Sequence, residues 1–535
     1  MAFPKVPYRV SAKSNAVISL RGINYSDSYS EGALADSKNI TAIRYPYFST
    51  KAAREEDLNL LGATSITAWN FLSYVMDNHF FYTKNGLDYI DCGEVSEEPK
   101  QYAMLYKKLV VWPDKKYLPV DDPTDGLQDM EASCSGTGAV IDHYTDSENI
   151  EYERITVSGW GADLDDVFSE RDSIKISGFS TDTNNGYHMI EKITATTMLF
   201  AKDTLTAETA SGTISFAREV PDMDFICESG NRLWGCSNSS QTIYCSRIDD
   251  PLNFYDYTGE ADDSFAIDVS SAGNFTGCCK LSSSVLFFKE QCLHKILGAY
   301  NAEFQLMTYT MHGIAAGSHK SAQVMNEVLY YLGTDGVYAY NGGTASLISQ
   351  DLGEKRLRLG VAATDGVNYY LSCYDGENPV FLTFYGRYGL WLKEDDTRAL
   401  DMCRVGSDVY ILTNSHRVFK EIGSDATLPV DFLIQFKPFY ETVTGSYQRS
   451  TVAFGHKRYG KLIARTEMSP GTWAAFEIRE DGGLWREVAK LVGETGLSRV
   501  VFPIGRVDKY EIRIRGNGQF TLKNMLREFR VGSDK

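Results

Sequence analysis

A short aromatic-rich run decides the fold class: Leu329-Tyr330-Tyr331-Leu332, followed by Gly336-Val337-Tyr338-Ala339-Tyr340. Aromatic side chains pack well on a pleated sheet, and the Asp and Gly between the two segments favour a tight turn. The run therefore predicts a two-stranded hairpin. Because a lone hairpin cannot bury both of its faces, it needs neighbours of the same kind.

The same pattern recurs along the chain. Seven such hairpins begin at residues 80, 109, 233, 286, 329, 369 and 409, and the last three intervals are 43, 40 and 40 residues. A four-stranded propeller blade occupies ~40–50 residues, so most intervals fit one blade each. We therefore predict an all-β fold built on a β-propeller. An open sandwich of meanders is the alternative that the same hairpins permit.

The interval of 124 residues between the second and third hairpins has a different texture. Residues 138–219 contain five short strands about a dozen residues apart, for example Ser173-Ile174-Lys175-Ile176-Ser177. Evenly spaced, alternating strands of this kind predict a small β-barrel or sandwich. Without them the interval is an ordinary blade repeat, so we predict an inserted domain.

The two ends of the chain differ from its middle. Residues 1–55 are polar with few apolar runs, and we expect an extended N-terminal arm suited to lie on a neighbouring subunit. Residues 428–535 mostly alternate apolar and charged side chains, which predicts a half-buried antiparallel sheet and hence a C-terminal β-sandwich. The propeller then occupies residues 56–137 and 220–427.

The charge balance is acidic. The 535 residues include 53 Lys and Arg against 71 Asp and Glu, a net charge of −18. A protein that wraps nucleic acid needs cationic side chains on the phosphates, so this balance argues against tight DNA binding. Basic residues gather after residue 446, and a less acidic cap on an acidic body suggests self-docking or ring formation. A solvated alternating face is the alternative.

Motifs for catalysis are absent from the sequence, which has no G-x-S-x-G elbow and no H-E-x-x-H pair. Residues 313–321 evoke a phosphate loop but lack its spacing. Residues 121–126 are as rich in Asp as a calcium loop, yet Pro123 and Ala132 replace expected ligands. Residues 481–485 only partly echo the hairpins of glycosidase propellers. We predict no enzyme, no cofactor, and no catalytic, cofactor-binding or metal-binding residues.

Three strings resemble a family: Asn231-Arg232-Leu233-Trp234-Gly235, Thr242-Ile243-Tyr244-Cys245-Ser246 and Asp250-Pro251-Leu252-Asn253-Phe254. Together they are similar to the N-R-x-W-G … I-x-x-S … D-P-x-x-W/F run of tailed-phage tail proteins. Weaker matches lie at residues 287–290, 317–321, 335–343 and 527–534. The chain thus resembles, best over residues 220–350, the packaged-DNA stabilisation and tail-nozzle proteins of short-tailed phages, and related virion proteins of phages from Gram-positive hosts.

The resemblance implies a non-enzymatic structural component of a virion tail, made in the host cytoplasm. It implies a hub, nozzle or adaptor ring, with a hexamer favoured, that contacts other tail or connector proteins. DNA is expected to pass through without tight binding, and no membrane insertion is expected. The alternative is a tail-tip adhesin that binds host-surface carbohydrate through the C-terminal sandwich. Its exposed platforms would be side chains such as Trp473 or Trp485, although their alternation with neighbouring residues favours burial.

Overall fold

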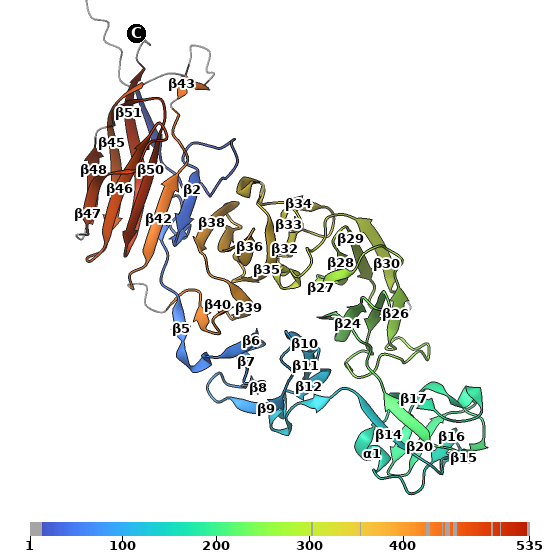
Figure 1. Cartoon of the computed structure of the whole chain (residues 1–535). Helices are drawn as coiled ribbons and strands as arrows, with labels where there is room; N and C mark the ends of the chain where they lie inside the picture. The colour runs from blue at the N-terminus through green and yellow to red at the C-terminus, as the bar shows by residue number, and fades with distance from the viewer. Residues whose placement is uncertain are drawn as a thin grey trace, which may run out of the picture. The chain divides into compact units, whose positions relative to one another are not determined.

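The structure is a computed structural model (Figure 1). It describes residues 13–300, 303–353, 355–423, 428–440, 442–444, 450–452, 457–493, 496–502 and 504–531. The first twelve residues of the expected arm, residues 424–427 before the expected sandwich, and residues 532–534 of the family-like ending lie outside the described residues. Within the described ranges, no helix has both the length and the apolar character needed to cross a membrane.

Seven four-stranded sheets form the propeller part of the described chain. The first three are β6 (Ala63–Ala68), β7 (Leu72–Met76), β8 (His79–Tyr82) and β9 (Ile90–Glu94); β10 (Gln101–Leu105), β11 (Lys108–Trp112), β12 (Lys116–Pro119) and β13 (Gln128–Asp129); and β23 (Phe225–Ser229), β24 (Arg232–Ser237), β25 (Thr242–Cys245) and β26 (Phe265–Asp268). The next two are β27 (Phe275–Leu281), β28 (Ser284–Lys289), β29 (Cys292–Leu297) and β30 (Gln305–Thr310); and β31 (Gln323–Met325), β32 (Val328–Gly333), β33 (Gly336–Tyr340) and β34 (Ala345–Leu347).

The last two sheets are β35 (Leu357–Thr364), β36 (Asn368–Asp375), β37 (Asn378–Tyr385) and β38 (Leu390–Asp395); and β39 (Ala399–Val405), β40 (Asp408–Thr413), β41 (Val418–Lys420) and β5 (Glu55–Asp57). Each of the seven predicted hairpins falls in a different one of these sheets. The prediction of an all-β chain with a β-propeller is confirmed.

Inner strands of these sheets bury both faces, which explains why they read as unbroken apolar runs. All six residues of β24 and all six of β28 are buried, whereas β30 is mostly exposed. Neighbouring sheets then pack through the buried side chains. Trp234 of β24 lies in one apolar cluster with Phe275 and Phe287 of the next sheet. Phe381 likewise packs with Ile411 of the sheet that contains β5.

The chain divides into two compact units. The first comprises Met1–Leu61, Asp335–Ala339 and Ser346–Lys535, and the second comprises Gly62–Thr334 and Tyr340–Ala345. The second unit holds the inserted domain, and the first holds the sheets built from the chain ends.

The inserted domain has two sheets, β14-β22-β17-β18 and β19-β20-β16-β15-β21. Its elements are β14 (Ala132–Gly136), β15 (Val140–Thr145), β16 (Glu151–Thr156), α1 (Leu164–Val167), β17 (Ser173–Ser177), β18 (Gly186–Met189), β19 (Lys192–Thr194), β20 (Thr197–Ala201), β21 (Glu208–Thr209) and β22 (Ile214–Arg218). The alternating strand β17 points Ile174 and Ile176 into a buried core with Phe200 and Phe216. These strands run from residue 132 to 218, against the 138–219 expected from the sequence.

The N-terminal segment differs from the extended arm that the sequence suggested. Its strands β1 (Lys13–Val17), β2 (Leu34–Lys38), β3 (Ile40–Thr41), β4 (Phe48–Thr50) and β5 belong to sheets of its own chain. β1 and β4 pair with β51 (Phe520–Val531), β2 pairs with β42 (Asp431–Phe436), and β5 pairs with β41. The polar composition of this segment does not prevent strand formation, because strands pair through backbone hydrogen bonds that require no apolar side chain. The sequence-based expectation of an extended arm was therefore wrong for the described strands.

A buried ion-pair network fixes this segment. Lys51 contacts the carboxylates of Glu394 and Glu421. The Arg54 guanidinium lies 2.6 Å from Glu421, 2.8 Å from Asp395 and 3.1 Å from Glu394. Burial and repulsion from Glu394 raise the pKa of Glu421 to about 7 despite Arg54. Lys51 and Arg54 lower the pKa of Glu394 although its burial opposes ionisation.

The C-terminal part is a β-sandwich of two sheets. One is β2-β42-β50-β46-β47, and the other contains β3, β4, β51, β45 and β48, with β1 and β49 attached. The remaining bounds are β43 (Thr442–Thr444), β44 (Ser450–Val452), β45 (Lys457–Met468), β46 (Trp473–Glu480), β47 (Arg486–Val492), β48 (Gly496–Phe502), β49 (Arg506–Val507) and β50 (Tyr510–Asn517). The two sheets meet through stacked rings of Phe432 and Phe520, 4.9 Å apart.

Candidate functional site

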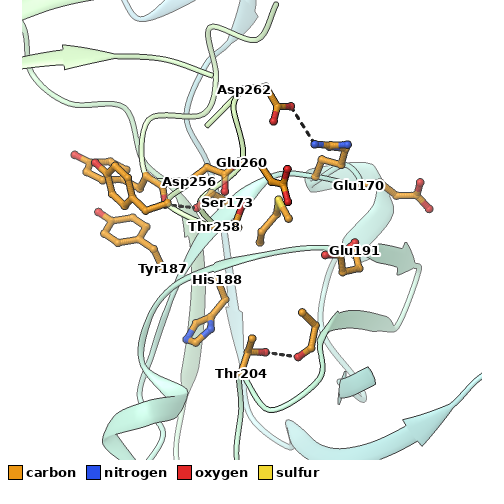
Figure 2. A pocket seen from close by; sticks show the side chains of 15 residues that line it. Glu170, Ser173, Tyr187, His188, Glu191, Thr204, Asp256, Thr258, Glu260 and Asp262 are labelled. Carbon is orange, nitrogen blue, oxygen red and sulfur yellow. Dashed lines mark hydrogen bonds and ion pairs between the residues drawn. The ribbon is translucent and has the colours of Figure 1, made fainter. Parts of the chain in front are cut away.

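A cavity of about 810 Å³ lies in the second unit, between the inserted domain and the loop that joins β25 to β26 (Figure 2). Five carboxylate side chains line it: Glu170, Glu191, Asp256, Glu260 and Asp262. They come from three separate stretches of sequence. The domain insertion therefore creates this acidic hollow, which no single segment contains.

The loop that supplies three of these acids is held by Asp263, which is fully buried. Its carboxylate accepts hydrogen bonds from the backbone N–H of Gly259 at 2.6 Å and of Glu260 at 3.1 Å, and from the Thr258 hydroxyl at 3.0 Å. Acidic side chains that accept several local N–H bonds fix tight turns. The turn presents Glu260 and Asp262 on the rim of the cavity (Figure 2).

Asp256 is the most perturbed acid of the cavity. It is 1% exposed, and its Oδ2 lies 3.0 Å from the Arg247 guanidinium. Burial, together with the negative charges of Asp263 and Asp262, raises the pKa of Asp256 to about 7. A carboxyl with a pKa near neutrality can exchange a proton under physiological conditions, which is a property of acid–base groups in clefts.

The cavity has few balancing cations. Arg171 lines it but is largely exposed and lies 3.2 Å from Asp262. Arg247, buried beneath the loop, also binds Asp262, at 2.8 Å. With five acids, of which Asp256 is only partly ionised near pH 7, against these two cations, the hollow carries a negative field that attracts cationic groups. Among the described residues, no group of three or more His, Cys, Asp or Glu is arranged to hold a metal ion.

An aromatic wall closes one side of the cavity. Tyr187 of the inserted domain stacks on Tyr255, with ring centroids 4.2 Å apart. The Ser173 hydroxyl donates a hydrogen bond of 2.8 Å to the Tyr255 carbonyl oxygen (Figure 2). The Tyr187 hydroxyl donates to Glu219 at 2.6 Å, and burial raises the pKa of Tyr187. Burial also lowers the pKa of His188, so this lining imidazole is neutral at pH 7.

The three family-like strings lie next to this cavity, and their residues hold the loops around it in position. Arg232 is 2% exposed and donates to three backbone carbonyls: Ser246 at 3.0 Å, Asp263 at 2.6 Å and Ala261 at 3.0 Å. All three acceptors belong to the loop that joins β25 to β26, which we call the acidic loop. The Arg of the N-R-x-W-G string is thus a positioning residue for that loop.

The D-P-x-x-F string has a similar role. Asp250 accepts a hydrogen bond from the Leu252 N–H at 3.0 Å and so fixes the turn. The Asn253 side-chain oxygen accepts from the backbone N–H of Ser173 at 2.8 Å, which joins the inserted domain to the propeller sheet. These strings therefore describe how the second unit is built.

The two loop motifs that the sequence singled out are turns. Residues 313–321 end in a 3₁₀ turn, His319–Ser321, before β31. A Cβ atom on Gly313 would lie 2.0 Å from the Lys289 carbonyl oxygen, so this glycine serves a close backbone approach. Residues 121–126 contain the 3₁₀ turn Pro123–Asp125, with Gly126 at φ 73°.

Trp473 and Trp485 differ from the expectation of burial. Both are half-exposed, on or beside the outer face of the sandwich. The core residues of β46 have the opposite parity, as Phe476 and Ile478 show. Lys490 lies over the Trp473 ring at 4.9 Å, and Arg513 lies over Trp485 at 4.4 Å. Cations therefore cover both indole rings.

Neither a family model nor a curated protein matches the chain. Solved structures that it resembles include an exo-β-1,3-galactanase from Phanerochaete chrysosporium, at 9% identity and TM-score 0.21 over 55% of this chain and 92% of that one. An engineered GH43 glycoside hydrolase matches at 9% identity and TM-score 0.21, over 57% of this chain and 97% of that one. Kluyveromyces lactis Hsv2 matches at 10% identity and TM-score 0.27, over 52% of this chain and 71% of that one. Because glycoside hydrolases stand among these matches, the sequence-based exclusion of enzymes is corrected and withdrawn. Likeness this weak assigns no activity.

Proposed function

We propose that this chain is a structural subunit of a phage tail that assembles with further copies of itself into a ring on the DNA passage. The observation that carries the proposal is the placement of the three family-like strings. Arg232, Ser246 and Asn253, one from each string, lie together in the second unit, and they hold the acidic loop and the inserted domain in place. Side chains with shared structural roles support a real resemblance over a chance match.

The electrostatic balance also supports this proposal. A wall with excess negative charge repels phosphates within a Debye length of about 8 Å at physiological salt. Such a passage keeps duplex DNA mobile, whereas a ring that grips DNA needs Lys and Arg on the phosphates. The net charge of −18 fits the first kind of ring.

Mass determination of the purified full-length protein tests the proposal. We expect a discrete closed assembly of identical subunits, with six favoured, and no measurable binding of a 30-base-pair duplex at physiological salt. Imaging of intact particles with a label on residue 535 then locates the ring in the tail. A protein that stays monomeric at all concentrations, or that binds the duplex with micromolar or tighter affinity, contradicts the proposal.

A further inference from the structure

The outer face of the sandwich sheet β42-β50-β46-β47 carries a cluster of cationic side chains, opposite in sign to the acidic cavity. Register places Glu477 of β46 opposite Arg513 of β50, and Ala475 opposite Arg515. The Arg513 guanidinium donates to Glu477 at 2.6 Å, and Arg515 donates to it at 2.9 Å. Arg479 pairs with Glu511 one step further along the same face.

These ion pairs do not cancel at the surface. The side chains of Glu477 and Glu511 are 7% and 8% exposed, whereas those of Arg479, Arg513 and Arg515 are 32%, 27% and 48% exposed. The acids therefore lie underneath and the guanidinium groups lie on top. Together with Lys490, these guanidinium groups form a positive patch on a protein whose net charge is strongly negative, and the exposed acids Asp431 and Glu487 of the same sheet border it.

The guanidinium groups are also held in place. Arg479 and Arg513 both lie over the Trp485 ring, at 4.9 and 4.4 Å. Planar guanidinium groups stacked on an indole and anchored by a buried carboxylate lose little freedom when they bind a second carboxylate. Because cations cover the rings, Trp473 and Trp485 offer little free surface for stacking a sugar.

We propose that this arginine face, formed by Arg479, Lys490, Arg513 and Arg515 around Trp485, docks on the acidic cavity of a second copy of the chain. The occupant is argued from charge complementarity. The cavity rim offers Glu170, Glu191 and Glu260, and no described ion pair engages these three acids. This inference rests on the proposed ring.

A contact between two different surfaces of identical subunits is heterologous, so it propagates from one copy to the next. Such a contact closes into a ring when the rotation between neighbours allows it. Complementary charges on the two surfaces speed the encounter and fix the register, and their effect weakens with salt. The arginine face and the cavity therefore account for both the polarity and the specificity of the assembly.

Two charge-reversal variants of the full chain test this pairing. The face variant combines Lys490→Glu with Arg515→Glu and keeps Arg513 on the buried Glu477. The cavity variant combines Glu170→Lys with Glu260→Lys, both exposed side chains. A matched control, Lys461→Glu with Arg465→Glu, makes the same charge change on the other sheet of the sandwich. Circular dichroism of each variant checks that the fold is retained.

Sedimentation velocity at 50 mM salt then measures assembly. We expect each variant alone to need at least a tenfold higher concentration for half-assembly, and the control to behave like the wild type. An equimolar mixture of the two variants should assemble again, because each reversed face meets a reversed cavity.

Three results would overturn the pairing: variants that assemble normally, a mixture that does not recover, or a control as impaired as the variants. Capture of dextran sulfate by the wild type but not by the face variant, with assembly unchanged, would instead assign the face to an anionic glycan. In each case, assembly of the wild-type protein into a ring remains consistent with the proposed function. A wild-type protein that stays monomeric refutes the proposed function.

Discussion

Replacing Arg232 with methionine should loosen the acidic loop more than any surface change near it. The substitution removes three charge-assisted hydrogen bonds, to the carbonyls of Ser246, Ala261 and Asp263. Each such bond is worth about 1.5–3 kcal/mol, and each buried carbonyl left without a donor costs a further amount. Methionine fills part of the space and removes a buried charge, so we expect a net loss of about 3–5 kcal/mol.

Amide hydrogen exchange is the suitable assay, because it reports the opening of β24, β25 and the loop separately from the rest of the chain. A loss of about 3–5 kcal/mol corresponds to exchange that is between about 10²- and 10⁴-fold faster, since 1.36 kcal/mol is tenfold. Arg171→Met is the matched control, because it removes one exposed ion pair to Asp262 in the same loop. The control should change protection by less than about 1 kcal/mol. Equal protection in Arg232→Met and the wild type would refute the positioning role.

Three further changes test the packing. Arg54→Met leaves the buried carboxylates of Glu394 and Glu421 with Lys51 as their remaining cation, and urea unfolding should show a loss of about 3–5 kcal/mol in the first unit. Glu421 has a pKa of about 7 in the folded chain, above its ordinary value, so its ionisation should lower the stability of the fold as pH rises from 5 to 8. Thermal unfolding of Glu421→Gln should lack this fall in stability. Parallel pH curves for the variant and the wild type would contradict the prediction. Gly235→Ala would bring a Cβ to 2.2 Å from the Met223 sulfur. We expect this variant to lose about 1–3 kcal/mol of folding stability and to melt at a lower temperature. An unchanged melting temperature would show that the site has room for the methyl group.

The seven hairpins could be predicted because they include inner strands. All residues of β28 and most residues of β32 are buried, so these strands appear as runs of Leu, Phe and Tyr. The outer strands gave no such signal. β30 is mostly exposed and β34 has only three residues, so neither stands out by composition.

Long-range pairing explains the larger miss at the N-terminus. Lys51 and Arg54 look like surface residues in the sequence, yet they bind Glu394 and Glu421 in a buried network. The partners are more than 300 positions apart, and local pattern holds no information about such a pair. The strand pairing of β5 with β41 was hidden for the same reason.

The acidic cavity was missed because its lining comes from distant segments. One local signal was present: residues 256–263 contain four acids, including the buried Asp256 and Asp263. In the C-terminal sandwich, Trp473 was expected to be buried because the wrong one of the two alternating sets of residues in β46 was assigned to the core. Alternation was recognised, but the sequence alone does not say which of the two alternating sets faces inward.

The pairing of β5 with β41 bears on the order in which a nascent chain can mature. Asp57 meets Val418 only after some 360 further residues have left the ribosome, and translation at about 5–20 residues per second makes that wait roughly 20–70 s. The continuous stretch 62–334 is complete well before then, so most of the second unit can form first. The arginine face that we expect to recruit other copies is synthesised after the acidic cavity, so we expect little association between half-made polypeptides.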